Sequence, residues 1–238
     1  MSSDRDLKFF MARVADQAER EEDVVRIMKE LAAEDPKLSA DERNLLSVAY
    51  KALTGSRRTA LRTVNAFLEE DSIKSNADRV AKLEELRDKL AKELNDYCDD
   101  LIKLIDDTLL NDDDDAITKV FYWKLKADYY RYSVEFKKEE EDRKVNSDKA
   151  KEAYTKAVEI AKKDLQKANP QYLGLALNYS VFLYEIDGQK QEAIRLADET
   201  FKGAVELLDE LTEDEYSEAT LVLQLLKDNV ALWNEESQ

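Results

Sequence analysis

The sequence predicts an all-helical protein built from a few long helices. Its 238 residues include only 4 glycines and 2 prolines, so it lacks the turn residues that the many connections of an α/β or all-β fold require. Apolar residues make up 43% of the chain, and they recur at steps of three and four, which is the period of a helix with one buried face. This content suffices for one large core or two small ones, and a single globular unit is the default expectation.

Several helix starts are indicated by capping residues. Ser39 with Glu42, and Thr212 with Glu215, have the spacing of a capping box, in which each residue satisfies a backbone N–H of the other. Asn169-Pro170 fits an N-cap followed by a proline in the first helical turn. These positions therefore predict the beginnings of three helices.

Helix breaks complete the outline. Asp35-Pro36 is expected to separate the second helix from the third, and Asp187-Gly188 to end one helix before the next begins. The almost wholly charged stretch 137–149 fits either a solvated helix end or a loop, and we interpret it as a loop. We predict about nine helices, over residues 3–17, 20–33, 39–70, 75–109, 115–137, 147–164, 170–186, 190–207 and 213–234.

The helix predicted over 75–109 carries an apolar stripe that runs from Leu83 to Ile105 without an intervening glycine or proline. Cys98 lies on this stripe and has no basic residue nearby on its own face. We therefore interpret Cys98 as a buried structural thiol rather than a nucleophile.

Charge and composition restrict the class of partner. The chain has 37 lysines and arginines against 54 aspartates and glutamates, a formal net charge of -17, so it repels nucleic acid and anionic membranes on average. An anion site must then be a local basic cluster. One cysteine, no histidine and no apolar leader predict a cytoplasmic protein without a disulfide framework.

The sequence also lacks the common signatures of enzymes and cofactor sites. Without histidine the usual nucleophilic triads and His-containing metal sites are excluded, and the 4 glycines are too scattered for a phosphate-binding loop. The acidic run 111–115 lacks the glycine and the distal glutamate of a calcium loop, so we interpret it as a solvated loop and helix N-cap. We predict a protein that is not an enzyme and has no cofactor or metal.

Several polar residues recur seven positions apart, a spacing that returns to nearly the same helix face after two turns. Lys51 and Arg58 form one such pair, and Lys124 and Arg131 form a second. Asp128 lies one turn before Arg131, where it could fix the guanidinium group. A charged surface places some such pairs by chance, so the spacing alone does not establish a site.

If these faces converge in one concavity, they would form a phosphate site. Arg58 and Arg131 would bind phosphate with paired donors, Lys51 would add a point charge, and Tyr132 would donate its hydroxyl. The same spacing recurs on later helices in two further pairs, Asn178 with Glu185 and Val222 with Asn229.

Four long segments resemble the most distinctive segments of the 14-3-3 family, in the same order and with the same spacing. They are RNLLSVAYK (43–51), KVFYWKLKADYYRY (119–132), LGLALNYSVFLYEI (173–186) and TLVLQLLKDNVALW (220–233). The resemblance implies nine antiparallel helices in an L-shaped protomer, paired into a cup-shaped homodimer with two concave amphipathic grooves. It further implies a single domain over 1–238, with 1–110 forming the dimerisation half and groove floor and 111–238 the groove wall.

The resemblance also implies roles for individual residues. The family's phosphate contacts fall on Lys51, Arg58, Arg131 and Tyr132. The residues that match the rest of the groove are Lys124, Asn178, Glu185, Asn229, Trp233, Leu177, Val181, Leu221, Val222 and Leu225. The residues that match the dimer seam are Arg20 with Glu93 and Asp23 with Lys89 as ion pairs, and Val14, Ala18, Ala60, Val64 and Leu90 as its apolar part.

The chain departs from the family pattern at a few of these places. Ala52 replaces an asparagine beside the groove lysine, Leu61 replaces a tryptophan, and Leu86 replaces a tyrosine of the dimer seam. Ala60 replaces a serine whose phosphorylation can separate some family dimers. We also expect no groove inhibition by a long acidic tail, since the chain ends five residues after Trp233.

The leading functional hypothesis is an adaptor that binds phosphoserine- or phosphothreonine-containing segments of client proteins, as a homodimer or as a heterodimer with a related chain. A second hypothesis is a helical scaffold or chaperone-like dimer that uses the apolar groove without depending on phosphate. A third, an enzyme that uses carboxylates or a bound cation, rests only on residues 112–115 and the acidic excess.

Overall fold

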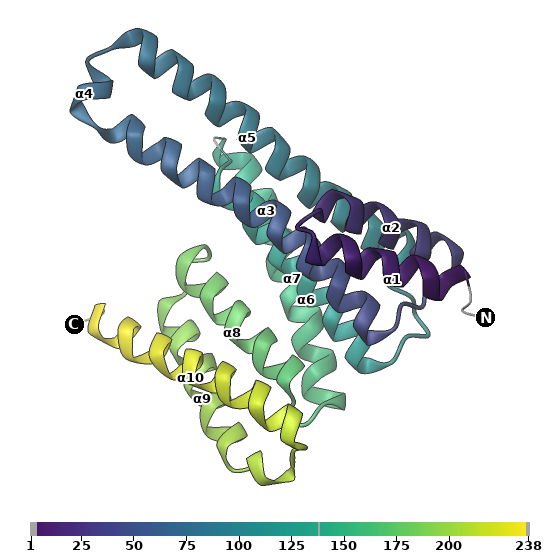
Figure 1. Cartoon of the computed structure of the whole chain (residues 1–238). Helices are drawn as coiled ribbons and strands as arrows, with labels where there is room; N and C mark the ends of the chain where they lie inside the picture. The colour runs from purple at the N-terminus through teal and green to yellow at the C-terminus, as the bar shows by residue number, and fades with distance from the viewer. Residues whose placement is uncertain (1–3, 138, 237–238) are drawn as a thin grey trace. The chain divides into compact units, whose positions relative to one another are not determined.

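A computed structural model describes residues 4–137 and 139–236 (Figure 1). All regular structure in this part of the chain is helical, which confirms the predicted fold class. Residue 3 of the first predicted helix, residue 138 of the predicted loop and both ends of the predicted domain lie outside the described residues. The described residues separate into two compact units, with 4–109, 135–137 and 139 in the first and 110–134 and 140–236 in the second.

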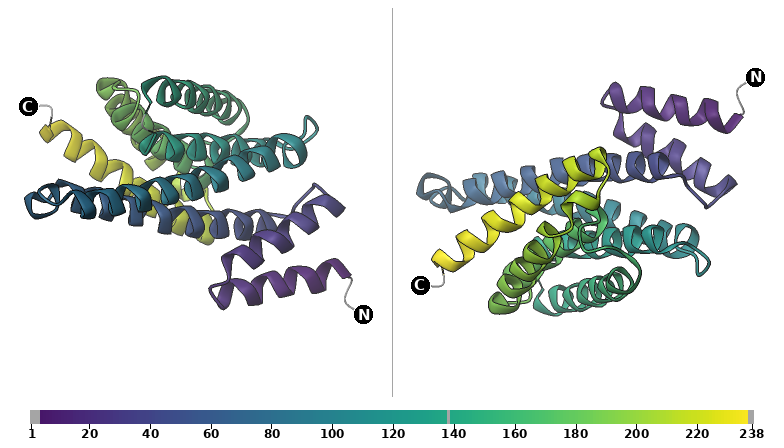
Figure 2. Two further views of the ribbon diagram at one scale, coloured as in Figure 1. Left: turned by 90° about the horizontal axis from the view of Figure 1, so that it is seen from above. Right: turned by 90° about the horizontal axis from the view of Figure 1, so that it is seen from below.

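The first unit is organised around two long helices. They are α3 (Ala40–Glu69) and α5 (Ala77–Leu104), which lie side by side and are joined through the single turn of α4 (Asp71–Lys74) (Figures 1 and 2). The shorter α1 (Asp4–Gln17) and α2 (Glu21–Glu34) pack on each other and on α3. The last turn of the α5 segment, η1 (Ile105–Leu109), widens into a π-helix. The core of this unit contains fully buried side chains that include Met28, Leu31, Leu46, Leu61 and Leu94.

The second unit contains the remaining helices. They are α6 (Ala116–Glu135, whose last residue clusters with the first unit), α7 (Glu140–Asp164), α8 (Pro170–Glu185), α9 (Lys190–Val205), the 3-10 turn η2 (Leu208–Glu210) and α10 (Glu213–Glu236). Helices α8, α9 and α10 pack on one another, and α7 packs on α8. Buried alanines on α7 and α9 let each of these helices pack closely on α8, and Tyr154 of α7 contacts Phe182 of α8 within the core.

The predicted capping residues are confirmed. The Ser39 hydroxyl accepts a hydrogen bond from the backbone N–H of Glu42, and the Glu42 carboxylate accepts one from the N–H of Ser39. Thr212 and Glu215 make the same reciprocal pair. The side chain of Asn169 caps α8, with Pro170 as its first residue. These local contacts explain why the helix starts could be read from the sequence.

The loop predicted over 137–149 is wrong, because α7 already begins at Glu140. Most residues between Glu140 and Lys149 are charged and compatible with a helix, and the stretch contains neither glycine nor proline to interrupt it. Glu140, Glu141 and Asp142 also place negative charge in the first turn, where the helix dipole favours it. The amide of Asn146 donates to the Ser133 hydroxyl at 3.0 Å and ties this exposed turn to α6.

The described residues contain ten α-helices, one more than the sequence outline predicts. The additional helix is α4, a single turn that ends the hairpin of α3 and α5. Such a short element has no apolar periodicity, so the pattern that predicts the longer helices does not reveal it.

Candidate functional site

A buried carboxylate organises the polar residues of α6 and α8 in the second unit. Asp128 is 3% exposed, and its oxygens accept hydrogen bonds from Lys124 at 2.8 Å, from Arg131 at 3.3 Å and from the Asn178 amide at 2.9 and 3.0 Å. The hydroxyl of Tyr154 also donates to it. Three residues predicted for the site, Lys124, Arg131 and Asn178, therefore converge on one acidic side chain.

The charge state of this cluster follows from its contacts. Burial alone would raise the pKa of Asp128, but the adjacent charges of Lys124 and Arg131, together with hydrogen bonds from Lys124 and Tyr154, hold that pKa below its ordinary value. Asp128 is therefore ionised at neutral pH. Two cations surround one carboxylate, so the cluster carries one surplus positive charge.

Aromatic side chains fix the position of Arg131. Its guanidinium lies over the ring of Tyr132, with 4.9 Å from the guanidinium carbon to the ring centroid, and its Nε donates to the Tyr154 hydroxyl at 3.1 Å. Tyr132 in turn packs edge-on against Tyr129, and Tyr154 stacks on Tyr179. Arg131 is thus held by a carboxylate, a hydroxyl and an aromatic face, which reduces the entropy it would lose on binding an anion.

The first unit contains a second cluster in which two cations share one carboxylate. The guanidinium of Arg58 on α3 donates to one oxygen of Glu135 at 2.7 and 2.8 Å, and Arg62, one turn later, donates to the other oxygen at 2.6 and 2.8 Å. Two cations again share one carboxylate and leave one surplus positive charge. Lys51 lies exposed on the same helix, two turns before Arg58. Local positive charge of this kind is what an anion site requires in a chain of net charge -17.

The residues predicted for the rest of the groove lie on α8 and α10 of the second unit. Leu177, Val181 and Val222 are half-buried and pack against the core. Leu221 and Leu225 are exposed, at 67% and 45% of their surface. The remaining predicted positions are the half-buried Asn229 and the exposed Glu185. Two packed helices thus carry a row of accessible apolar side chains interrupted by an amide.

Trp233, unlike the other residues predicted for the groove on α10, is buried, with only 5% of its surface exposed. Its indole ring stacks on Tyr184 with 4.5 Å between ring centroids and 9° between ring planes. The Tyr184 hydroxyl donates to Glu236 at 2.7 Å. Trp233 therefore anchors α10 to α8 through packing.

The residues predicted for the dimer seam lie in the first unit and make contacts within it. Arg20 pairs with Asp23 at 2.5 Å, and Glu93 pairs with Arg57 at 3.2 Å. Of the predicted apolar seam, Val14 is 44% exposed and Val64 is buried. The other predicted members are the exposed Ala18 and Lys89 and the half-buried Ala60 and Leu90.

Two residue assignments made from the sequence are confirmed. Cys98 is fully buried, and this burial raises the pKa of its thiol to about 12. In the acidic run, Asp115 accepts the backbone N–H of Thr118 at 2.7 Å and so caps α6, while Asp114 accepts the N–H of Asn111 at 2.8 Å. Across 4–137 and 139–236, no group of three or more acidic or thiol side chains has an arrangement that could hold a metal ion.

Comparison with known proteins decides the family. The family model described as 14-3-3 protein matches residues 11–234. The chain belongs to the 14-3-3 family. It is 42% identical to 14-3-3 protein 3 of Entamoeba histolytica over 237 residues, covering 100% of this chain and 98% of that protein.

Other 14-3-3 relatives match over a similar length. The checkpoint signal transducer rad25 of Schizosaccharomyces pombe is 40% identical over 238 residues, with 100% of this chain and 88% of the relative covered. The 14-3-3-like protein 1 of Caenorhabditis elegans is 43% identical over 225 residues, which span 94% of this chain and 89% of the relative. The matching family model is that of a 14-3-3 protein rather than of an enzyme. Within the described part of this 14-3-3 chain, every helix is too short or too polar to cross a bilayer.

The candidate site contains three residues that the sequence did not predict. Tyr154, Glu135 and Arg62 were missed because they meet their partners through contacts 26, 77 and 73 residues apart in the chain. The position of Arg62, one turn after Arg58 on the same face, is a signal that could have indicated it. No spacing rule connects Tyr154 or Glu135 to its partner.

Proposed function

We propose that this protein is an adaptor that binds phosphoserine- or phosphothreonine-containing segments of client proteins. The observation that carries the proposal is the cluster around Asp128, which holds Arg131 and Lys124 in place and keeps a surplus positive charge in a 14-3-3 chain that is otherwise acidic. A phosphate group, at a charge of about -1.5 to -2, is the anion that such preorganised donors favour.

Individual residues take different roles in this proposal. Arg58 and Arg131 bind the phosphate oxygens through their guanidinium groups, Lys51 adds a point charge, and Tyr132 donates its hydroxyl. Asn178 and Asn229 hold the backbone of the extended client segment. The side chains that flank the phosphorylated residue contact Lys124, Glu185, Leu177, Val181, Leu221, Val222 and Leu225. Trp233, which is only 5% exposed, contributes to the groove by packing on Tyr184 and holding α10 against α8.

We also propose a dimer, formed with a second copy or with a related chain. Residues 1–110 carry dimerisation and 111–238 supply the groove wall. Because Arg20 and Glu93 already have partners within the chain, an intersubunit ion pair between them would replace existing contacts and contribute little net free energy. Burial of the exposed Val14 and its apolar neighbours is then the main stabilising term.

The net charge and the buried cysteine indicate the partners and the compartment that suit this protein. The net charge of -17 opposes nucleic acid and anionic membranes as partners. With its cysteine buried and reduced, the chain suits the cytoplasm. Its action on clients needs no chemistry of its own, so we propose a binding protein rather than an enzyme, without a cofactor.

The proposal is tested by fluorescence anisotropy with a labelled peptide of the Arg-Ser-x-pSer-x-Pro type and its unphosphorylated twin. We expect micromolar or tighter binding of the phosphorylated peptide alone. The double variant Arg58→Ala with Arg131→Ala should lose this binding and keep its helical circular dichroism. As a matched control, Arg195→Ala removes an exposed arginine that is paired with Glu192 and Glu199 on α9, and it should bind normally.

Equal binding of both peptides would overturn the proposal in favour of a scaffold that does not depend on phosphate. Undiminished affinity in the double variant would leave phosphate recognition standing but would remove Arg58 and Arg131 from it. Raising the salt concentration should weaken the phosphorylated peptide's binding, because much of the attraction is between charges.

A further inference from the structure

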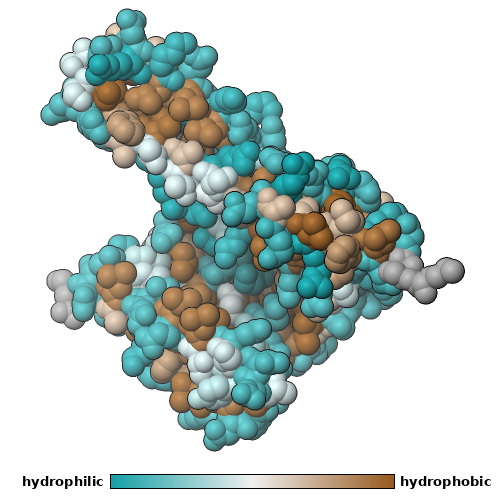
Figure 3. Space-filling view, viewed as in Figure 1, coloured by the Kyte–Doolittle hydropathy of each residue, from teal (hydrophilic) through white to brown (hydrophobic). Residues whose placement is uncertain are grey.

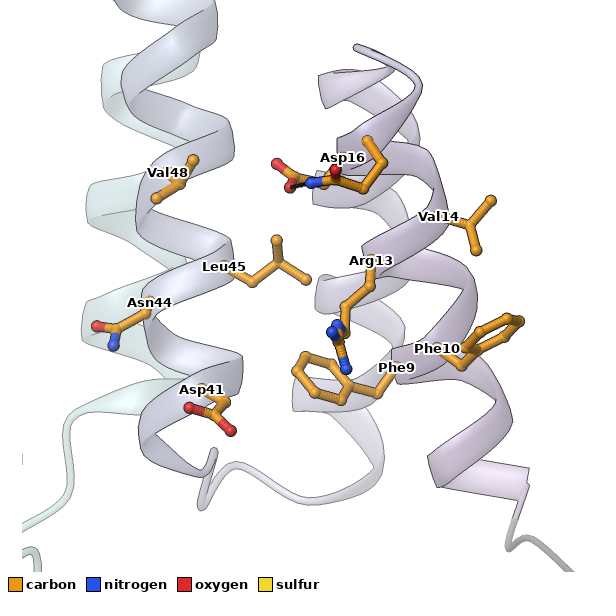
Figure 4. Close-up of a pocket in the computed structure, with 10 residues that line it drawn as sticks. Phe9, Phe10, Arg13, Val14, Asp16, Asp41, Asn44, Leu45 and Val48 are labelled. Carbon is orange, nitrogen blue, oxygen red and sulfur yellow. Dashed lines mark hydrogen bonds between the residues drawn. The ribbon is translucent and has the colours of Figure 1, made fainter.

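The apolar surfaces of the first unit coincide with the proposed dimer seam. Figure 3 shows apolar side chains gathered over the hairpin of α3 and α5, and Leu90 of the proposed seam lies on α5. A cleft of about 880 Å³ separates α1 from α3. In Figure 4, Phe9 and Leu45 point into this cleft, whereas Val14 of the proposed seam points away from α3. The exposed faces of α1 and of the hairpin are therefore not free for a different partner in that dimer.

A cluster of lysines and aromatic rings lies in the second unit, on α6 and α7. Lys126 of α6 and Lys156 of α7 lie over the ring of Trp123, with 5.1 and 4.7 Å from the ammonium nitrogen to the ring centroid. Lys126 and Lys149 of α7 lie over the ring of Tyr130, at 6.0 and 5.6 Å. We call these five residues the lysine–aromatic cluster. They bring three ammonium groups to two rings.

The lysine–aromatic cluster is separate from the candidate phosphate site. Lys126 is two residues from both Lys124 and Asp128, and two residues turn an α-helix by about 200°. Lys126 therefore lies on nearly the opposite side of α6. The five residues of the cluster belong to the second unit, whereas all residues proposed for the dimer seam belong to the first. The cluster is thus a surface distinct from both the groove and the seam.

One carboxylate pairs with a lysine of the cluster. Glu152, which is exposed on α7, accepts from Lys156 at 3.0 Å. The hydrogen bond and the charge of Lys156, together with the charge of Lys126, hold the pKa of Glu152 below its ordinary value. Glu152 is therefore ionised at neutral pH and offsets one of the three positive charges.

The flanking acidic residues of α7 act on other cations. The charge of Asp148 acts on Lys151, which pairs with Asp187 at 2.8 Å. Glu159 lines a separate pocket together with Lys163. Three cations against the single carboxylate of Glu152 thus leave the lysine–aromatic cluster with two surplus positive charges, in a chain whose net charge is -17.

The rings hold these cations without neutralising them. The face of an aromatic ring attracts an ammonium group and restricts where it lies. An ammonium group has three N–H donors, so donors remain for an anion on the side away from the ring. Lys149 and Lys156 are exposed, which leaves these donors accessible. Because the gathered ammonium groups repel one another, a bound anion would relieve that repulsion as well as form new contacts.

We propose that the lysine–aromatic cluster binds a short, extended acidic segment of a protein partner, with aspartate or glutamate at alternate positions. Lys149 and Lys156 are seven residues apart, a rise of about 10 Å along α7. Carboxylates at alternate positions of an extended segment lie on one side, about 7 Å apart, so two or three of them span the cluster. Nucleic acid or an anionic membrane would extend beyond this small cluster and be repelled by the acidic chain.

The test uses a rhodamine-labelled, acetylated peptide Gly-Glu-Ser-Glu-Ser-Glu-Gly, its twin with lysine in place of each glutamate, and the full chain. We expect saturable anisotropy for the glutamate peptide only, and weaker binding at higher salt. An excess of the phosphopeptide should not displace the glutamate peptide, and the double variant Arg58→Ala with Arg131→Ala should still bind it. The proposed adaptor function is measured separately with the phosphopeptide, so the two can fail independently.

Variants with matched controls locate the site. Lys149→Glu should weaken the glutamate peptide about tenfold or more, whereas Lys144→Glu makes the same change of charge at another exposed lysine of α7 and should bind normally. Trp123→Leu keeps an apolar side chain but removes the ring under two of the lysines, and it should weaken the peptide about threefold. Its control, Tyr216→Leu, removes an exposed ring on α10 and should have no effect.

Several results would overturn the proposal. They are the absence of saturable binding up to millimolar protein, displacement by the phosphopeptide, and equal effects of Lys149→Glu and Lys144→Glu. A loss of self-association in Lys149→Glu, measured by light scattering, would instead assign the cluster to a second copy of the chain. Cosedimentation with phosphatidylserine vesicles that is lost in Lys149→Glu would assign it to a membrane.

Discussion

Replacing Asp128 with asparagine is the most direct test of how the candidate site is built. The substitution keeps the shape of the side chain but removes the negative charge on which Lys124, Arg131 and Asn178 converge. Breaking a buried ion pair by removing one partner costs about 3–5 kcal/mol. The side chain of Lys124 is 22% exposed and can turn to solvent, whereas that of Arg131 is only 12% exposed. We therefore expect the free energy of unfolding to fall by about 3 kcal/mol, the lower end of this range.

Tryptophan fluorescence offers a specific readout of this loss. Both tryptophans of the chain, Trp123 and Trp233, lie in the second unit with Asp128, so urea unfolding followed by their emission reports on that unit. A loss of about 3 kcal/mol corresponds to a change of about 100-fold in the unfolding equilibrium. Asp198→Asn, which removes an exposed carboxylate paired with Lys202, should change stability by less than about 1 kcal/mol.

The pH dependence gives an independent check on the same residue. Because the contacts of Asp128 hold its folded-state pKa below the ordinary 3.8, its charge stabilises the fold fully above the unfolded pKa. That contribution is lost as the pH falls through the lowered folded pKa. The stability difference between the parent and Asp128→Asn should thus be full at pH 7 and shrink below about pH 4.

Asp128 does not organise the cluster if Asp128→Asn costs less than about 1 kcal/mol at pH 7, or if the cost is the same at pH 7 and pH 3. Either result would mean that the cations do not depend on the carboxylate for their positions. Phosphopeptide affinity should fall together with stability, since an unsupported Arg131 must be ordered again on binding.

Other predictions follow from single contacts. The thiol of Cys98, buried and with its pKa raised to about 12, should resist a disulfide reagent at pH 8 in the native protein and react rapidly in urea; fast native reaction would contradict its burial. Ser39→Ala removes the reciprocal cap of α3 and should cost about 1 kcal/mol in urea unfolding, while Ser72→Ala is a serine control outside any cap. Light scattering should find Leu90→Asp to be a monomer and Arg20→Ala to be a dimer, because Arg20 already has a partner in its own chain. The reverse pattern would mean that ion pairs hold the dimer seam together.

The parts of this structure that the sequence predicts are those set by neighbours along the chain. The caps at Ser39 and Thr212 involve residues three positions apart, and the burial of Cys98 follows from its place on one helical stripe. The loop predicted for the charged stretch before Lys149 is wrong, because a solvated helix has no apolar period to distinguish it from a loop. Charge composition alone does not separate these two states.

The candidate site likewise contains contacts that the sequence predicts and contacts that it does not. The i,i+3 spacing of Asp128 and Arg131 predicts their contact, and the structure has it. The spacing does not predict that Tyr154 and Asn178 complete the cluster, because helix packing brings these residues from other segments. Nor does it predict Glu135 as the partner of Arg58.

The pairing of cations with fewer carboxylates also explains how an acidic protein can select a phosphate. In the cluster around Asp128, and again in the pair of arginines at Glu135, each carboxylate fixes two cations without cancelling both charges. Loose cations in a chain with 54 acidic residues would pair with nearby carboxylates, and an incoming ligand would have to break those pairs. Cations that are already fixed keep their surplus charge. A phosphate carries a charge of about -1.5 to -2 and three acceptor oxygens. It is therefore attracted to this surplus positive charge more strongly than the singly charged side chain of an aspartate or glutamate. Preorganisation by shared carboxylates thus favours phosphorylated segments over merely acidic ones.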